Sequence, residues 1–371
     1  MRKVPTEYLT PGMIVAKHIF TKDGRVLLGQ GVELTKRYID GLIKKGIPAL
    51  FIEDQLSSDI IAEDVVLDNT RNQAVSQIKH AITQISKKVD KKINIVNINE
   101  TISDIVDQLL ENKNIIYNLA DIRSVDNYLF GHSVNVCILS IMTGIGLQYN
   151  RSQLEDLAKG SLLHDIGKAM VPYEILNKPG KLTPEEFEEI KKHPTHSLEI
   201  LRKNSGVSSV SRIIAYQHHE KYNGDGYPSC LKGKDILDAS QIVGIADMYD
   251  AITSDRCYRG AMPANEAYEL ISASGNFYFK FDIVKAFLNQ IAAFPEGSYV
   301  ELNTNEIALV VENIKGYSSK PKVRIITSPD HTIIKPFMDV DLINTKNKVI
   351  TKILRENEIQ PLLKQINKAF T

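Results

Sequence analysis

The stretch LLHDIGK, residues 162–168, decides the fold of this chain. A histidine and an aspartate follow two leucines at the end of a predicted helix, and this pairing is unusual in a plain apolar core. Adjacent residues on a helix point about 100° apart, so His164 can bind a metal ion terminally while the Asp165 carboxylate bridges two ions. Gly167 is expected to let the backbone turn, and Lys168 to bring a cation to the edge of the site.

Further histidines and aspartates recur on both sides of this stretch, over residues 129–250. Imidazole and carboxylate are ligands of first-row divalent metal ions. The set exceeds the three or four protein ligands that one metal ion needs, which predicts two ions sharing a site. Two ions roughly 3.5–4 Å apart are a standard arrangement for in-line displacement at phosphorus, so the pattern predicts a metal-dependent phosphohydrolase. The candidate ligands are His132, His164, Asp165, His193, His218, His219 and Asp247.

The local context of these residues differs. His132 is predicted midway along an apolar helix, where a lone histidine is more often a core residue. His193 is expected to end a charged helix, because a proline follows it. Asp247 lies in the apolar stretch IVGIADMYDAI (242–252), where its burial without a cation would be costly. Asp250 lies three residues further on, on the same helix face.

The histidine pair His218-His219 closes another predicted helix. The glycine-rich loop that follows, KYNGDGYP (221–228), can bring backbone amides and the ring of Tyr227 close to a ligand. The ligand set and this loop together predict a site for a phosphate-containing molecule.

A mechanism follows from the ligand types. Asp165 would bridge the two metal ions, and a water or hydroxide between them would be acidified and would attack phosphorus in line. Lys168 would act beside it at the reacting phosphate. Lys168, Arg256 and Arg259 are candidate phosphate clamps, and plain surface charge is the alternative reading of all three.

Composition sets the broad class of the protein. The 371 residues include 45 Lys+Arg and 45 Asp+Glu, so the basic excess typical of proteins that bind a nucleic-acid backbone is missing. The three cysteines are odd in number and widely spaced, which favours a reducing compartment over a disulfide framework. The N-terminus has no apolar segment of signal-peptide length, and no run of about 18 apolar residues occurs. We therefore expect a cytoplasmic protein without membrane insertion and without a polymeric nucleic-acid partner.

The apolar periodicity predicts a mainly α chain in four parts. Residues 1–67 are expected to form a small α+β module with a β-hairpin turning at Asp23-Gly24, and residues 68–99 a helical connector. Residues 100–295 should form the catalytic helical domain, with helices at 100–118, 129–147, 152–164, 184–192, 195–204, 210–220, 240–253, 264–272 and 283–291. Residues 296–371 should form a β-rich subdomain, with strands at 298–302, 306–312, 322–327 and 332–337 and a helix at 358–370.

The chain carries four motifs: HDIGK (164–168), HP (193–194), HHEKYNGDGYP (218–228) and IADMYDAITSDRCYR (245–259). Together they resemble the HD-GYP family of bacterial cyclic di-GMP phosphodiesterases. The resemblance implies an HD-type helical, metal-dependent phosphohydrolase domain that hydrolyses the phosphodiester bonds of cyclic di-GMP, giving linear pGpG and then GMP. The substrate contacts that it implies are Lys168, Tyr227, Asp250, Arg256 and Arg259.

The resemblance also implies how the ligands are divided. One ion would take His132, His164 and Asp247, and the other His193, His218 and His219, with Asp165 between them. Some family members have a glutamate four residues before the first histidine and hold a third ion. Tyr128 occupies that position here, which favours two ions. A set without thiolate suits iron or manganese, and zinc, nickel and cobalt also fit.

The sequence departs from the family pattern at three positions. Asn223 stands where the family has an aspartate, Ser197 where it has a glycine after the HP motif, and Cys257 where it has a proline. None of the three is a metal ligand. Asn223 can form hydrogen bonds but cannot carry charge.

Two other functions are open. The enzyme could hydrolyse another nucleotide, such as cyclic GMP-AMP or a nucleoside phosphate, although the GYP loop argues against simple HD nucleotidases. The chain could also be a non-catalytic effector that binds cyclic di-GMP, although degenerate family members usually lose ligands and this chain has all of them. A homodimer or signalling-protein partners are also open, as is the input received by residues 1–67.

Overall fold

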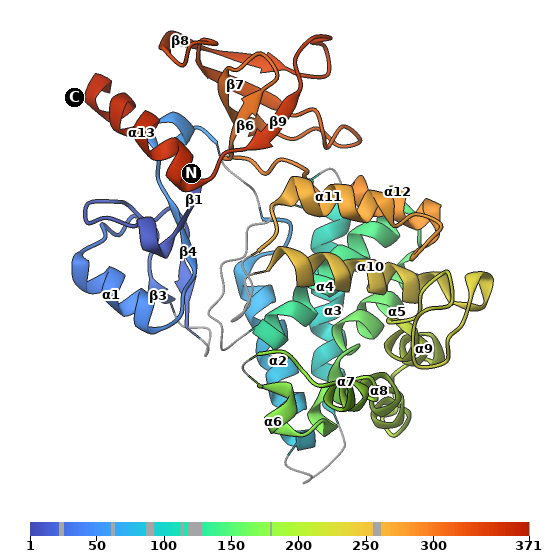
Figure 1. Ribbon diagram of the computed structural model, residues 1–371. Coiled ribbons are helices and arrows are strands. Elements are labelled where there is room, and N and C mark those ends of the chain that lie inside the picture. The colour runs from blue at the N-terminus through green and yellow to red at the C-terminus, as the bar shows by residue number, and fades with distance from the viewer. Residues whose placement is uncertain are drawn as a thin grey trace.

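The computed structural model describes residues 1–21, 26–60, 64–86, 93–112, 115–117, 128–178, 180–254 and 261–370. Figure 1 shows a large helical part, beside which lie a small N-terminal unit and a C-terminal β-sheet with one long helix. The predicted mainly α fold with a smaller α+β part before it and a β-rich part after it is confirmed. None of the described helices is both long and apolar enough to cross a bilayer. The boundaries of the four predicted parts stay predictions.

The helical part is built around one buried helix. α4 is apolar on nearly all sides, so it can be stable only when other helices cover it. It packs against α2, α3, α5, α10 and α12. The helices are α2 (Asp68–Ser86), α3 (Ile95–Glu111), α4 (Tyr128–Gly146), α5 (Arg151–Leu162), α6 (Tyr173–Leu176), α7 (Pro184–Ile190), α8 (His193–Arg202), α9 (Ser209–Gln217), α10 (Asp238–Thr253), α11 (Ala264–Ala273) and α12 (Phe281–Leu288).

Two predicted helix positions were wrong, and in each case the reason lies in the residues at the start of the helix. The helix expected at 100–118 is α3, which begins earlier because the Asn94 side chain accepts a hydrogen bond from the Asn97 amide. His193 begins α8 instead of ending a helix. A proline in the first turn is compatible with a helix start, because the amide that it lacks has no partner inside the helix at that point. Helix α6 was not predicted.

The N-terminal unit contains two small antiparallel strand pairs and one helix. β1 (Arg2–Pro5) pairs with β4 (Ala49–Ile52), and β2 (Ile19–Phe20) pairs with β3 (Val26–Leu28). Helix α1 (Lys36–Lys44) covers them, and Thr35 caps its start by accepting from the Tyr38 amide. The predicted hairpin is therefore present, while its turn at Asp23-Gly24 lies outside the described residues. Strand β1 was not predicted.

The C-terminal part is a five-stranded antiparallel sheet in the order β8-β7-β6-β5-β9. Its strands are β5 (Tyr299–Leu302), β6 (Ile307–Glu312), β7 (Lys322–Thr327), β8 (Ile333–Asp341) and β9 (Ile350–Ile353). Helix α13 (Glu356–Phe370) packs Ile359, Leu362 and Ile366 on one face of the sheet. β8 contains Pro336 and is an edge strand, where a missing amide donor does no harm. β9 was not predicted, because a four-residue strand is too short to reveal its period.

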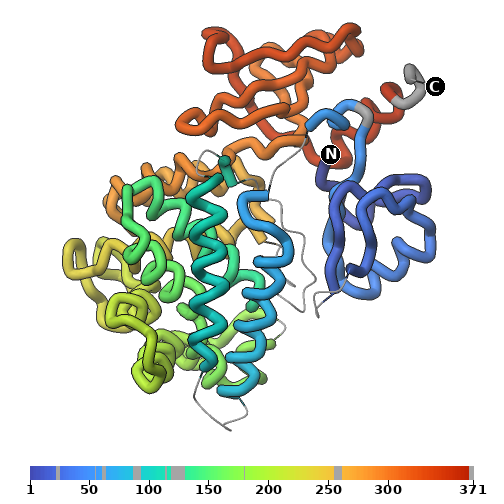
Figure 2. The backbone as a smooth tube through the Cα atoms, turned by 180° about the vertical axis from the view of Figure 1, so that it is seen from behind, coloured from blue at the N-terminus to red at the C-terminus, as the bar shows by residue number. Residues whose placement is uncertain are grey.

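A buried ion cluster joins the two ends of the chain. The Arg2 guanidinium donates to both carboxylate oxygens of Glu356 in α13, at 2.7 and 2.6 Å, and its Nε lies 3.0 Å from Asp54. Leu56 and Ile60 enter the same apolar cluster as α13. The N-terminal unit and the C-terminal part are therefore in contact, and Figure 2 shows them side by side from behind.

We expect Arg2→Met to destabilise the protein by about 3–5 kcal/mol, because it leaves two buried carboxylates without their cation. Urea unfolding measures the change. Lys352→Met is a matched control, since Lys352 pairs with Glu301 and Glu358 at the same sheet and helix but is half exposed. An Arg2→Met variant no less stable than the Lys352→Met variant would refute this role for Arg2.

Candidate metal centre

The seven predicted ligand side chains converge inside the helical part. They come from the beginning of α4, the junction between α5 and η4 (Ile166–Met170), the first residue of α8, the end of α9 and the middle of α10. His132 therefore lies near the start of its helix and not midway along it. Five of the seven are buried, namely His132, His164, Asp165, His193 and His218.

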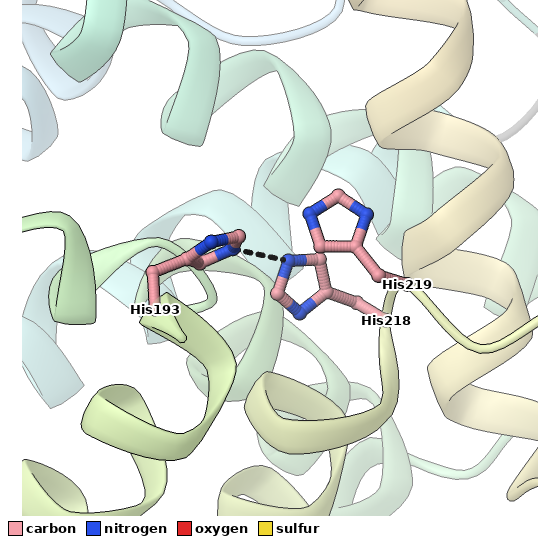
Figure 3. Close-up of side chains that lie close together, drawn as sticks. All are labelled: His193, His218 and His219. Carbon is pink, nitrogen blue, oxygen red and sulfur yellow. Dashed lines mark hydrogen bonds between the residues drawn. The ribbon is translucent and has the colours of Figure 1, made fainter. Parts of the chain in front are cut away.

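Backbone carbonyls fix which ring nitrogen faces the centre in three of the histidines. Nδ1 of His164, His193 and His218 lies 2.7, 2.7 and 2.9 Å from the carbonyl oxygen three residues earlier. A carbonyl can only accept, so Nδ1 carries the proton and Nε2 presents a lone pair. Nε2 of His193 and Nε2 of His218 are 3.3 Å apart, as Figure 3 shows. Lone pairs that approach in this way need a cation between them.

The Asp165 carboxylate lies at the centre, and its two oxygens face different histidines. Oδ1 is 3.2 Å from Nε2 of His193 and 4.0 Å from Nε2 of His218. Oδ2 is 3.3 Å from Nε2 of His164 and 3.9 Å from Nε2 of His132. A carboxylate that bridges two cations needs this geometry, with one oxygen available to each.

Candidate ligand atoms gather in two groups on either side of Asp165, and within each group they lie within 4.8 Å of one another. The first group is His132, His164 and Asp247, and the second is His193, His218 and His219, while Asp165 with His164 and His218 forms a third group that joins them. Nε2 of His164 is buried and has no hydrogen-bond partner among the described residues. Imidazole nitrogen and carboxylate oxygen fit divalent first-row metal ions, so the side chains present suit the ions that the sequence predicts.

The carboxylates of the centre are held in the ionised form. Burial alone would raise the pKa of Asp165, but electrostatic interaction with His164 and Lys168 brings it well below its usual value. Burial would likewise raise the pKa of Asp247, but a hydrogen bond from His132 brings it well below its usual value. Both carboxylates therefore carry the negative charge that attracts a cation.

The histidines of the second group are held neutral. Burial is the main cause that lowers the pKa of His193, His218 and His219 below the usual value. A metal ion binds only the unprotonated nitrogen of a histidine. Their burial therefore prepares these side chains to act as ligands at neutral pH.

One side of the centre is open to solvent. The side chains of His219 and Asp247 are 21% and 16% exposed. The Tyr227 ring stacks on His219, with ring centroids 4.6 Å apart and 27° between the planes. Nζ of Lys168, also partly exposed, donates to Oδ2 of Asp165 at 2.5 Å. An aromatic ring and an ammonium group thus border the side from which a phosphate can approach.

A buried glutamate holds the loop that carries Tyr227. Glu220 accepts hydrogen bonds from the amides of Ser229 and Leu231 at 2.7 and 2.9 Å, one at each carboxylate oxygen. Gly226 lies so close to the backbone of Lys221 that an added Cβ would be 2.3 Å from its nitrogen. Glu220 was given no role from the sequence, although its place directly after the histidine pair was a usable signal.

Gly167 is needed for close packing, and not for a left-handed backbone conformation where the chain turns. Its φ lies outside the left-handed region, but an added Cβ would be 2.0 Å from the carbonyl oxygen of His193. Its amide donates to Oγ of Ser197, and that hydroxyl donates to the carbonyl of His164. Ser197, noted only as a departure from the family pattern, thus fastens α8 to the segment that carries the central aspartate.

Asp250 lies behind the centre. It is buried, and its Oδ2 accepts from Nδ1 of His132 at 2.7 Å while its Oδ1 accepts from Asn135 at 2.6 Å. Burial alone would lower the pKa of His132, but hydrogen bonds to Asp247 and Asp250 raise it to about 9. This position does not support the predicted contact of Asp250 with substrate, and it suits an orienting role toward His132.

Two predicted substrate contacts, Arg256 and Arg259, lie outside the described residues. Asn135 was not singled out from the sequence. Its spacing of three residues from His132 on one helix places both on the same face, and this was the available signal.

Comparisons with known proteins agree with this arrangement. Residues 116–282 match the model of the HD domain, and residues 299–362 match the model of a KOW domain associated with the HD domain. The chain is 28% identical to cyclic di-GMP phosphodiesterase PA4108 of Pseudomonas aeruginosa, over 92% of this chain and 89% of that protein. It is 34% identical to cyclic di-GMP phosphodiesterase PdeB of Borreliella burgdorferi, over 63% and 62% of the two chains.

A third relative has a different substrate in its name. The chain is 32% identical to 3′3′-cGAMP-specific phosphodiesterase 2 of Vibrio cholerae, over 51% of this chain and 37% of that protein. All three relatives are named phosphodiesterases, which is consistent with the match to the HD domain. The chain therefore carries an HD domain, at residues 116–282.

Proposed function

We propose that this chain is a metal-dependent phosphodiesterase of the HD-GYP type that hydrolyses cyclic di-GMP to pGpG, GMP or both. The observation that carries the proposal is the position of Asp165, each oxygen of which faces a separate group of histidines. The name of the P. aeruginosa relative, which aligns with 92% of the chain, supports the substrate. The intact GYP motif at 226–228 supports the HD-GYP type.

The side chains would have separate roles in the reaction. Two divalent ions, iron or manganese by the donor set, would supply an acidified water and neutralise charge on the phosphate. One ion would be held by His132, His164 and Asp247 and the other by His193, His218 and His219, with Asp165 between them. Lys168 fixes one oxygen of Asp165 and lies where it can also meet a phosphate oxygen.

The remaining residues position the substrate and the ligands. Tyr227 covers His219 and would border the bound nucleotide. Asp250 orients His132 by accepting from its Nδ1. Arg256 and Arg259 stay predicted phosphate clamps. The proposal places the protein in the cytoplasm, with a small nucleotide and not a polymeric nucleic acid as its partner, and a homodimer stays a prediction.

We expect removal of metal to abolish hydrolysis and its return to restore it. Protein dialysed against a chelator should lose turnover of cyclic di-GMP to background, because without cations no acidified water is available and the histidine lone pairs face one another. Anaerobic addition of Fe²⁺ or Mn²⁺ should bring activity back, while protein dialysed without chelator serves as the control. Hydrolysis by protein that elemental analysis finds free of metal would contradict the proposal.

Cyclic GMP-AMP is a second candidate substrate, since relatives from V. cholerae with 32–37% identity are named 3′3′-cGAMP-specific. Parallel kcat/KM measurements on metal-replete protein decide between the two. A higher value for cyclic di-GMP is expected. A higher value for cyclic GMP-AMP would assign the other substrate, and tight binding of cyclic di-GMP without turnover would assign an effector role.

A further inference from the structure

We propose that Arg71, on helix α2, is a positioning residue for the metal centre and acts through Asn135 and Asp250 on His132. The inference rests on the ligand role of His132 in the proposed function, but not on which nucleotide is hydrolysed. α2 connects residues 1–67 to the helical part, so the effect of Arg71 would link that connector to the centre.

Four side chains form a continuous line of hydrogen bonds. Nη1 of Arg71 donates to Oδ1 of Asn135 at 2.9 Å, and Nδ2 of Asn135 donates to Oδ1 of Asp250 at 2.6 Å. Nδ1 of His132 donates to Oδ2 of Asp250 at 2.7 Å. Asn135, Asp250 and His132 are buried, and Arg71 is partly buried at the outer end. The line runs from the side of α2 through α4 and α10 to the ligand.

Arg71 matters because the asparagine amide has two ends of nearly equal shape and opposite polarity. A guanidinium can only donate, so it selects the amide oxygen and turns the amide nitrogen toward Asp250. Without Arg71 the amide oxygen loses its donor, and the hydrogen bond to Asp250 alone holds the orientation of Asn135. The carboxylate that holds His132 would then be fixed less firmly.

The consequence for the centre is confined to one group of ligands. Nδ1 of His132 donates to Asp250, which leaves Nε2 as the ring atom that faces Asp247, 3.0 Å away, and that a metal ion would bind in place of a proton. Carboxylates that orient a metal-binding histidine in this way also raise its basicity. His132 belongs to the first ligand group, whereas His193 and His218 of the second group donate to backbone carbonyls. Arg71 should therefore influence one ion and not the other.

Cobalt binding to the full chain without nucleotide tests the proposal. Metal-free protein is titrated with Co²⁺, and the visible absorption of the bound ion reports affinity and coordination. His132→Ala and His193→Ala identify which phase of the titration belongs to which ligand group. Arg71→Met removes the donor, Arg71→Lys retains one, and Gln77→Met is the matched control. Gln77 lies on the same helix and donates to the carbonyl of Asn97 and to Thr101, both on α3.

Arg71→Met should weaken, by roughly tenfold, only the phase that is lost in His132→Ala. Arg71→Lys should recover part of that affinity, and Gln77→Met should leave both phases as in wild type. The proposal is overturned if Arg71→Met binds both ions as wild type does, if it weakens both equally, or if His132→Ala removes no phase. Turnover is not needed for this readout, so an inert wild type would refute the proposed function alone.

Discussion

Asp165→Asn should lower kcat for cyclic di-GMP by about a thousandfold or more, which corresponds to ~4 kcal/mol of lost transition-state stabilisation. The amide has the shape of the carboxylate but no charge, and only one of its two ends can bind a cation. The two ligand groups would then have no common bridge. The buried histidines around residue 165 would also lose the neighbouring negative charge that favours the binding of cations.

Asp107→Asn is the matched control, because it makes the same chemical change on the surface of the helical part, where Asp107 pairs with Arg151. Metal content and steady-state kinetics should be measured for both variants. Asp165→Asn activity within tenfold of wild type would exclude the bridging role. If the Asp165→Asn variant lost hydrolysis but kept its signalling effect in the cell, the effector role would be correct.

Gly167→Ala should destabilise the protein by about 3 kcal/mol and release bound metal. Its Cβ would lie 2.0 Å from the carbonyl oxygen of His193 and 2.5 Å from the amide of Ser197. Both of these atoms belong to the backbone, so α8 would have to move away from η4. Overpacking of this kind typically costs about 1–3 kcal/mol. Because α8 begins with His193, the movement would draw one ligand out of the centre.

Gly41→Ala is the control for this substitution. Gly41 lies in helix α1, and an added Cβ meets no atom within 4 Å among the described residues. Alanine should stabilise the helix there by about 0.5–1 kcal/mol. Thermal unfolding and metal analysis compare the two. A Gly167→Ala variant that keeps wild-type metal content and stability would show that α8 and η4 can separate without loss of metal or stability.

The sequence was most informative where chemistry limits the choice of residue. The ligand histidines and Asp165 could be found because buried imidazole and carboxylate groups are costly without a cation, and no packing requirement explains them together. Their helices could be placed within a few residues because apolar periodicity is strong in a buried bundle. The same periodicity was too weak for the short strands β1 and β9.

Roles that depend on tertiary contacts could not be read from the sequence. The need for glycine at 167 comes from the carbonyl of His193, which is distant along the chain, so a local turn was the only interpretation available. Asp250 was assigned to substrate through a resemblance, but the direction in which its carboxylate points is set by Asn135 and His132 on another helix. Glu220 acts on a loop that lies on the far side of the GYP motif.

The histidines of the centre differ in what holds their rings. Three of the rings donate to a carbonyl in the last turn of a helix, where carbonyl groups have no partner within the helix. These are His164, His193 and His218. No side-chain substitution can remove such an acceptor. His132 instead depends on a carboxylate that itself depends on other side chains. The orientation of His132 is therefore adjustable by ordinary mutation or by a shift of the connecting helix, whereas the orientation of the other three rings is set by the backbone.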